Sequence, residues 1–338
     1  MKSSATGIKF FASAWSAPAW MKTNGDLSGR GRLKGSPGGK YYKTWAKYYV
    51  KFLQAYEEEG IRVWGLTTGN EPINGFVPGF RFNCMAFTPE TQRDFLKKDL
   101  GPALREAGYF TSLNDSNSIQ IMIVDDQRYT LPFYTWVVLG DSDTAQFVSG
   151  VAFHWYGNNY SPVSILDYVH KHHPNKFLFA SEATVEGKPN LGNWEEGERY
   201  AIDILTDLNH WTTAWIDWNF ALDLQGGPNW SKNWCDAPVI VNATSGEYYK
   251  QPMYYALGHF SKFISPGSMR IGVKTSLYTK LFLPKIRVSS FKTPEAVVTV
   301  VLNGYDSSKT VKVQNKVTGV SFTKELSARS FNTFISQN

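Results

Sequence analysis

Residues 62–72, RVWGLTTGNEP, carry the pattern that decides the fold. The first half of this stretch is short, apolar and rich in β-branched and aromatic side chains, so it predicts a buried strand. The strand then ends in an amide and a carboxylate, Asn70 and Glu71. A helical pattern over residues 42–59 comes directly before it, which gives one helix–strand unit.

Further units of the same kind lie on both sides of this stretch. Each contains an apolar run that ends in carboxylates, amides or aromatic residues, and the runs lie at 8–13, 120–124, 148–153, 176–180 and 213–216. The stretches between them can hold helices, one of which begins at Thr88-Pro89, a good N-cap followed by proline. This alternation predicts parallel strands with helical crossovers. Because no glycine fingerprint follows the first strand, it favours a (β/α)8 TIM barrel over an open doubly wound sheet.

The pattern changes towards the C-terminus. Short strands separated by polar turns are expected there, at residues 269–275, 281–289, 296–302, 310–314 and 320–324. They predict a β-sandwich-like module, joined to the barrel by a helix over 251–263. The predicted domains are therefore a barrel over 1–264 and a sandwich over 265–338.

Composition limits the classes of protein to consider. Hydrophobic residues make up 42% of the 338 residues and charged residues 19%, so a sizeable core is expected and general disorder is excluded. The net charge is +6, but the sequence has no recognisable nucleic-acid motif, so nucleic acid is not an expected partner. The charge predicts either attraction to an anionic lipid surface or ordinary solubility. Cys84 and Cys235 form neither a disulfide framework nor metal-ligand spacing.

Two carboxylates occupy equivalent positions in the predicted fold. Glu71 and Glu182 each follow the C-terminal end of a predicted barrel strand, where active sites of such folds lie. A pair of carboxyl groups across a glycosidic bond is the minimum equipment for glycoside hydrolysis, and a separation of about 5–5.5 Å is typical of retaining enzymes. On spacing alone, two glutamates at strand ends by coincidence remain the alternative.

The flanking residues favour the functional interpretation. Asn70 can hydrogen-bond a sugar 2-hydroxyl, and Tyr156 can donate to Glu182 and keep it ionised. Trp15 and Trp218 offer flat faces to a pyranose, although each aromatic residue taken singly is more typical of a core. Rival sites are weaker, since the sequence has no phosphate-binding loop and no serine-hydrolase elbow. Two adjacent aspartates at 125–126 make a poor metal pair, and the histidine at 154 lacks partners at metal spacing.

At these residues the sequence resembles glycoside hydrolase family 30. The resemblance runs in order through most of the chain and is densest before about residue 265. The matching stretches are Ser13 to Gly25, Gly69-Asn70-Glu71-Pro72, Phe87-Thr88-Pro89-Glu90, Asp125-Asp126-Gln127-Arg128, His154-Trp155-Tyr156, Phe179-Ala180-Ser181-Glu182-Ala183, Asp217-Trp218-Asn219, Gly226 to Trp230 and Gln251-Pro252-Met253.

The resemblance implies a retaining β-glucosidase that hydrolyses glucosylceramide to glucose and ceramide by double displacement, without a metal or organic cofactor. Glu71 would be the general acid/base and Glu182 the nucleophile. The implied glucose subsite consists of Trp15, Asn70, Gln127, Tyr156, Trp218 and Asn233, and Phe80 and Phe82 would shape the site mouth. Phe80 stands where the family pattern has tyrosine, and Thr184 where close relatives have cysteine, which leaves the aglycone preference open.

The resemblance also predicts that this chain is truncated at its N-terminus. The family barrel has eight strands and six are found here, so the first two βα units and the early strands of the sandwich are expected to be missing. A lysosomal or secreted location, an anionic lipid surface and a saposin-type activator are the implied context. Two alternatives stay open: a related enzyme for another β-glucoside or xyloside, and a non-catalytic barrel remnant.

Overall fold

The computed structural model describes residues 7–276 and 284–337. The chain divides into two compact units. The first contains residues up to Ala183 together with His210–Ile216, and the second contains Thr184–Asn209 together with the chain from Asp217 onwards. Each unit is described by itself below. No helix in the described residues combines the length and apolar character that crossing a membrane requires.

The first unit is built on a six-stranded parallel sheet whose strands follow the order of the sequence. Parallel strands with helices between each successive pair confirm the predicted α/β class, and the observed strands overlap all six predicted runs. The strands are β1 (Phe10–Ala12), β2 (Val63–Thr67), β3 (Gln120–Gln127), β4 (Gly150–His154), β5 (Phe177–Glu182) and β6 (Thr212–Trp215).

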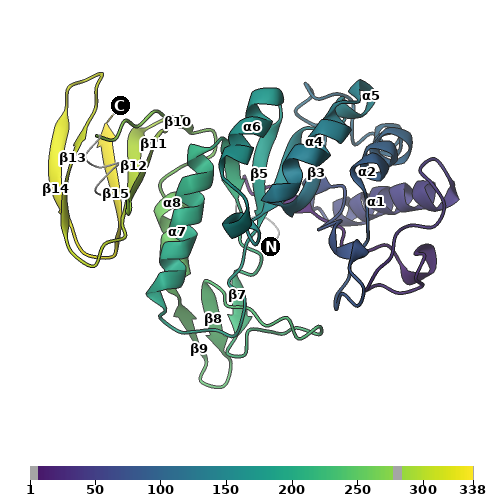
Figure 1. The fold of residues 1–338 in the computed structure, drawn as a ribbon, viewed down its shortest axis with the longest axis horizontal. Coiled ribbons are helices and arrows are strands. Elements are labelled where there is room, and N and C mark those ends of the chain that lie inside the picture. The colour runs from purple at the N-terminus through teal and green to yellow at the C-terminus, as the bar shows by residue number, and fades with distance from the viewer. Residues whose placement is uncertain (1–6, 277–283, 338) are drawn as a thin grey trace. The chain divides into compact units, whose positions relative to one another are not determined.

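Helices connect these strands, as expected for parallel pairs (Figure 1). The predicted cap at Thr88 is present, and its side chain accepts a hydrogen bond from the Thr91 N–H. The longer connecting helices are α1 (Lys40–Glu58), α2 (Pro89–Phe95), α3 (Gly101–Glu106), α4 (Leu131–Leu139), α5 (Ser142–Ala145) and α6 (Ser164–His172), with a π-helical turn η3 (Leu96–Leu100) after α2. Short 3-10 turns are η1 (Ala19–Met21), η2 (Asn74–Phe76), η4 (Arg128–Thr130) and η5 (Asn158–Tyr160).

The central strands of the sheet, β2 to β5, are buried on both faces, which is why they are almost continuously apolar. On the helix side, Ile121 and Ile123 belong to a large cluster that also contains α1 and α4 side chains. On the other face, Met122, Ala152 and Phe179 form a second cluster with partly buried aromatic residues. Full burial of one such side chain contributes about 1.5–3 kcal/mol.

β3 departs from regular strand geometry at its C-terminal end. Val124 and Asp125 have positive φ values of 75° and 54°, and the pairing with β4 shifts register between Val124 and Asp126. The sequence predicted that this strand ends at residue 124, but it continues to Gln127. A bulge of this kind re-aims side chains at the edge of a sheet.

The second unit combines two helices with three small sheets. Helices α7 (Trp194–Asn209) and α8 (Pro252–Ser261) pack together, and α8 is the helix that was predicted over 251–263. A sheet of β7 (Ala221–Asp223), β8 (Val239–Asn242) and β9 (Glu247–Lys250) was not predicted.

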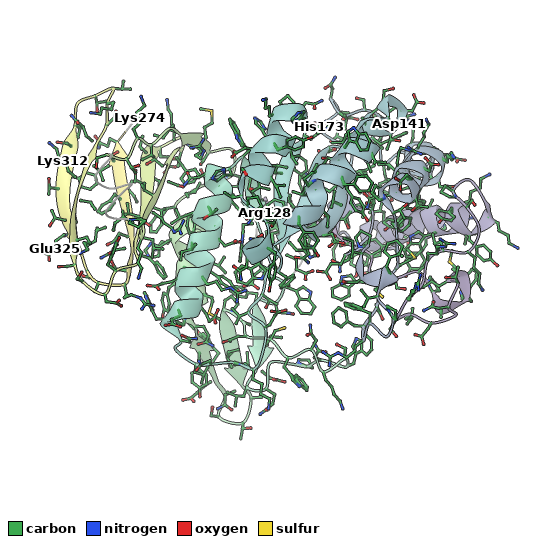
Figure 2. All side chains as sticks on the ribbon, in the orientation of Figure 1. Arg128, Asp141, His173, Lys274, Lys312 and Glu325 are labelled. Atoms are coloured by element: carbon green, nitrogen blue, oxygen red, sulfur yellow. The ribbon has the colours of Figure 1, made fainter. Side chains whose placement is uncertain are left out.

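The C-terminal strands are antiparallel, as a β-sandwich requires. One sheet has the order β10 (Met269–Ile271), β11 (Ile286–Lys292), β12 (Ala296–Asn303) and β15 (Ser330–Gln337), and a hairpin pairs β13 (Lys309–Gln314) with β14 (Ser321–Leu326). Figure 2 shows Lys312 and Glu325 on this hairpin. The sequence missed β15, and the start of the run predicted over 281–289 lies outside the described residues.

Candidate active site

Glu71 lies just beyond β2, in a left-handed conformation with φ 41°. This conformation costs a non-glycine residue roughly 1–2 kcal/mol. Its N–H donates to the Asp125 carbonyl over 2.8 Å, which ties the loop after β2 to the bulge of β3. Its carboxylate is buried and accepts hydrogen bonds from the side-chain amides of Gln127, over 2.8 Å, and of Asn74.

Glu182 is the last residue of β5. The Tyr156 hydroxyl donates to its Oε1 over 2.9 Å, so the contact predicted from the sequence is present. Burial raises the pKa of Glu182 to about 7, and the charge of Glu71 acts in the same direction. His154 and the Tyr156 hydroxyl oppose that rise because both stabilise the ionised carboxylate.

His154 lies at the centre of the site and is fully buried at the end of β4. Its Nδ1 is 3.1 Å from Oε1 of Glu71 and 4.0 Å from Oε1 of Glu182, and its Nε2 is 3.1 Å from Oδ1 of Asp125. Burial lowers the pKa of His154, but the charge of Glu182 and the hydrogen bonds to Asp125 and Glu71 outweigh burial and raise it well above its usual value. A carboxylate at each ring nitrogen favours the doubly protonated imidazolium.

Asp125 is buried and contacts the Nε2 side of His154. Its carboxylate accepts hydrogen bonds from the hydroxyls of Ser13 and Ser181 and contacts His154. Although burial raises the pKa of Asp125, His154 and the two hydroxyls lower it by more, so this buried aspartate is ionised. Three donors compensate for the desolvation of its charge.

Asp126 points to different partners from Asp125. Its carboxylate accepts from the N–H groups of Ile73 and Gln127, and burial together with the charge of Glu71 raises its pKa to about 7. The two neighbouring aspartates therefore have different hydrogen-bond partners.

The carboxylates of Glu71 and Glu182 lie close together. One oxygen from each, together with one nitrogen of His154, lie within 4.8 Å of one another. The spacing is near that of retaining glycosidases and shorter than the ~6.5–9.5 Å that inverting enzymes need for a water. The same three atoms also have the spacing of a metal site. In this arrangement, His154 supplies a positive charge beside the two carboxylates.

Three of the predicted aromatic residues, from the segments after β1 and β2, contact one another. The rings of Trp15 and Phe82 have centroids 5.6 Å apart, and those of Phe82 and Phe80 are 4.5 Å apart. All three side chains are partly exposed, as a surface that receives a ligand would be. Asn70 is buried directly before Glu71, and its N–H donates to the Ala14 carbonyl over 2.9 Å.

Trp218 and Asn233 belong to the second unit. Trp218 packs against a small buried cluster that includes Leu222 and Cys235. The Asn233 N–H donates to the Asn229 side chain over 3.2 Å. Their membership of the glucose subsite stays a prediction.

The sequence missed the two groups that organise the pair. His154 was set aside because its sequence neighbours offer no partners, yet its contacts are 83 and 29 residues away, at Glu71 and Asp125. Asn74, which binds Glu71, lies in the turn η2 just after it. The sequence did offer one signal for His154, because it lies at the end of a predicted strand, as the two glutamates do.

Comparisons with known proteins agree with this geometry. The glycosyl hydrolase family 30 TIM-barrel domain matches residues 1–264, and the family's β-sandwich domain matches residues 267–334. The lysosomal acid glucosylceramidase of Mus musculus is 45% identical over 309 residues, which are 90% of this chain and 58% of the mouse protein. The chain thus spans little more than half the length of that relative.

Solved structures show the same architecture. SrfJ from Salmonella typhimurium superposes with a TM-score of 0.86 at 26% identity, over 98% of this chain and 69% of SrfJ. The endo-β1,6-glucanase BT3312 superposes with a TM-score of 0.80 at 27% identity, over 98% of this chain and 72% of that enzyme. The chain belongs to glycosyl hydrolase family 30.

Proposed function

We propose that this chain is a retaining β-glucosidase that hydrolyses glucosylceramide to glucose and ceramide. The observation that carries the proposal is the pair Glu71 and Glu182, with oxygens within 4.8 Å and His154 in contact with Glu71. The 45% identity to the mouse glucosylceramidase supports glucosylceramide as the substrate.

Glu182 is the nucleophile in this proposal and Glu71 the acid/base. Glu182 attacks the anomeric carbon while Glu71 donates its proton to the ceramide oxygen, which leaves as an alcohol. Glu71, now ionised, takes a proton from water, and the resulting hydroxide displaces Glu182 to release β-glucose with retention. Tyr156 favours the ionised form of Glu182, since its hydroxyl donates to that carboxylate.

The pair shares one proton in the resting enzyme. The raised pKa of Glu182, about 7, means that the site retains a proton until near neutral pH. The proposed cycle needs that proton on Glu71 when the substrate binds. Activity is therefore expected to fall as the pH rises through about 7, where the shared proton is lost.

The proposed setting follows the mouse relative, which is lysosomal by name. We place the reaction in a lysosomal or secreted environment at an anionic lipid surface, with a saposin-type activator as a further partner. A second substrate class is supported by the likeness to the endo-β1,6-glucanase, since that enzyme acts on a β-glucan with the same fold. Another β-glucoside is thus the alternative substrate.

Glu182→Gln tests the proposal, with Glu186→Gln as the matched control on an exposed carboxylate four residues later. A fluorogenic β-glucoside and glucosylceramide in anionic detergent serve as substrates. We expect Glu182→Gln to lower kcat by at least about a thousandfold, because the covalent step has no nucleophile, and Glu186→Gln to leave it unchanged. An inactive wild-type chain, or an active Glu182→Gln variant, would overturn the proposal. Hydrolysis of the soluble glucoside alone would favour the alternative substrate.

A further inference from the structure

The positive charge of the chain is concentrated in its first part. Residues 1–56 contain ten lysine and arginine residues and one aspartate, whereas the other 282 residues contain 25 basic and 28 acidic residues. The net charge is thus +9 in this segment and −3 in the remainder. A surface built from this segment would attract an anionic partner.

Helix α1 presents much of this charge to solvent. Lys40, Lys43, Lys47 and Lys51 are all exposed, and their spacing of three or four residues puts them on one side of the helix, which we call the basic face. The opposite side is apolar and packs into the core of the first unit, through Tyr42, Trp45, Ala46, Tyr49, Val50 and Leu53.

The basic face has little opposite charge near it in the described part of the chain: the charge of Lys43 acts on the buried Asp99, where it opposes the rise in pKa that burial causes. None of its four lysines lies within ion-pair distance of a carboxylate there. Lys47 has Lys43 and Lys51 at the i−4 and i+4 positions, and like charges at this spacing destabilise a helix by about 0.2–0.5 kcal/mol per pair. The row is therefore unfavourable for the isolated protein.

The direction of the charges also opposes the helix dipole. Lys40 stands in the first turn, where a negative charge is favoured, and Glu57 and Glu58 form the C-terminal end, where a positive charge is favoured. Gly39 provides no side-chain cap. Helix stability thus gives no reason for this arrangement.

Aromatic side chains flank the basic face. Tyr48 is 53% exposed and stacks on Trp45. Trp20, in the turn η1, is 61% exposed and its ring centroid lies 6.4 Å from that of Tyr41 in the first turn of α1. The ammonium of Lys40 lies 5.2 Å from the same Tyr41 ring. Exposed Trp and Tyr beside lysines are typical of segments that lie at a membrane interface.

The start of α1 lies at the same edge of the sheet as the candidate active site. β1 and β2 are parallel, and α1 connects the C-terminal end of β1 to the start of β2. The first turn of α1 is therefore near the edge where Glu71 follows β2. A membrane bound there would lie close to the site that is proposed to receive a lipid.

We infer that the basic face of α1 docks the enzyme onto a bilayer with anionic headgroups. The inference rests on the proposed function for its purpose, since a lipid substrate must be reached at a membrane. Binding itself does not require catalysis and can be measured separately.

The test is cosedimentation of the chain with phosphatidylcholine vesicles that contain phosphatidylserine. Lys43→Gln, Lys47→Gln and Lys51→Gln together are expected to lower the partition coefficient about a hundredfold, since each lysine near such a surface contributes about fivefold. The matched control removes three exposed lysines from the β13–β14 hairpin by Lys312→Gln, Lys316→Gln and Lys324→Gln, and it should bind like wild type. Wild-type binding should also weaken in about 1 M salt and with phosphatidylcholine alone.

Several results would overturn the inference. If wild type does not bind the vesicles at about 0.1 M salt, the inference is wrong and an acidic protein is left as the occupant of the basic face. The inference is also wrong if the two triple variants lose binding equally. The α1 variant should melt no lower than wild type, because it loses two repulsive pairs, so weaker binding cannot be attributed to unfolding. Hydrolysis of a soluble aryl β-glucoside without lipid is measured in parallel. Vesicle binding without hydrolysis would contradict only the proposed function. Hydrolysis without vesicle binding would contradict only the inference that the basic face docks on a bilayer.

Discussion

The imidazolium of His154 contacts carboxylates from three different strand ends, and this makes it the residue on which the electrostatics of the site depend. Its Nδ1 faces Glu71 and Glu182 while its Nε2 is fixed by Asp125. No glucose contact is needed for this role. His154 is therefore a positioning residue, which acts on the reaction through the two glutamates.

We predict that His154→Gln shifts the pH profile of kcat/KM as well as lowering its maximum. Removal of a positive charge 4.0 Å from Glu182 raises the pKa of that carboxyl above about 7. Since loss of the shared proton sets the alkaline limb of the profile, that limb should move up by about 1–2 pH units. The measurement is hydrolysis of an aryl β-glucoside across pH, with the exposed His172→Gln as control. An unshifted limb in a folded His154→Gln variant would reduce the role of His154 to packing.

At the scale of elements, helix α2 supports the strained end of β3. The side-chain carbonyl of Gln92, which is fully buried in α2, accepts a hydrogen bond from the Val124 N–H over 3.2 Å. Val124 has a positive φ and precedes Asp125, so this bond stabilises the bulge that aims Asp125 at His154. A helix on the outer layer is thereby connected to the site.

Gln92→Leu should therefore reduce both stability and activity. An unsatisfied buried N–H costs about 1–3 kcal/mol, and the bulge is expected to relax and disturb Asp125. Thr88→Ala is the control in the same helix, because loss of its cap costs about 1 kcal/mol but does not touch β3. Urea unfolding and kcat of the folded fraction are compared for both variants. Equal specific activities would show that α2 stabilises the fold alone.

The strands and the site residues differ in how well the sequence predicts them. The central strands β2 to β5 were found because burial on both faces makes each a nearly continuous apolar run. The edge strands β1 and β6 are less buried and were found by their short apolar stretches. β15 was missed because Ser330–Gln337 is only partly buried and mixes polar with apolar residues. Glu71 and Glu182 were found by their place after strands, whereas the contacts of His154 depend on strands that only the folded sheet brings together.

At the scale of the whole molecule, the buried acids make stability depend on pH. The pKa values of Glu182 and Asp126 are raised to about 7 in the folded state, above their ordinary values of 4.5 and 3.8. At pH values between the ordinary and the raised pKa, these two carboxyl groups are ionised in the unfolded chain but protonated in the folded chain. The free energy of unfolding therefore falls as the pH rises. The raised pKa of His154 acts in the same sense, since its stabilising charge is lost at high pH.

We therefore predict a lower free energy of unfolding at pH 8 than at pH 5. Glu182→Gln keeps the neutral form at both pH values and should narrow that difference by up to about 3 kcal/mol. Glu186→Gln should leave it as in wild type. Urea titrations at the two pH values provide the measurement, and a Glu182→Gln variant with the full wild-type difference would contradict the prediction.

The position of His154 has one more consequence for the proposed cycle. When Glu71 gives up its proton and Glu182 becomes an ester, the total charge of the site does not change. One unit of negative charge has moved from Glu182 to Glu71, over less than 4.8 Å, and both of these carboxylates face Nδ1 of the imidazolium. The fixed cation is in place before and after this transfer, so the surrounding dipoles have little to reorganise as the glycosyl–enzyme forms and breaks down.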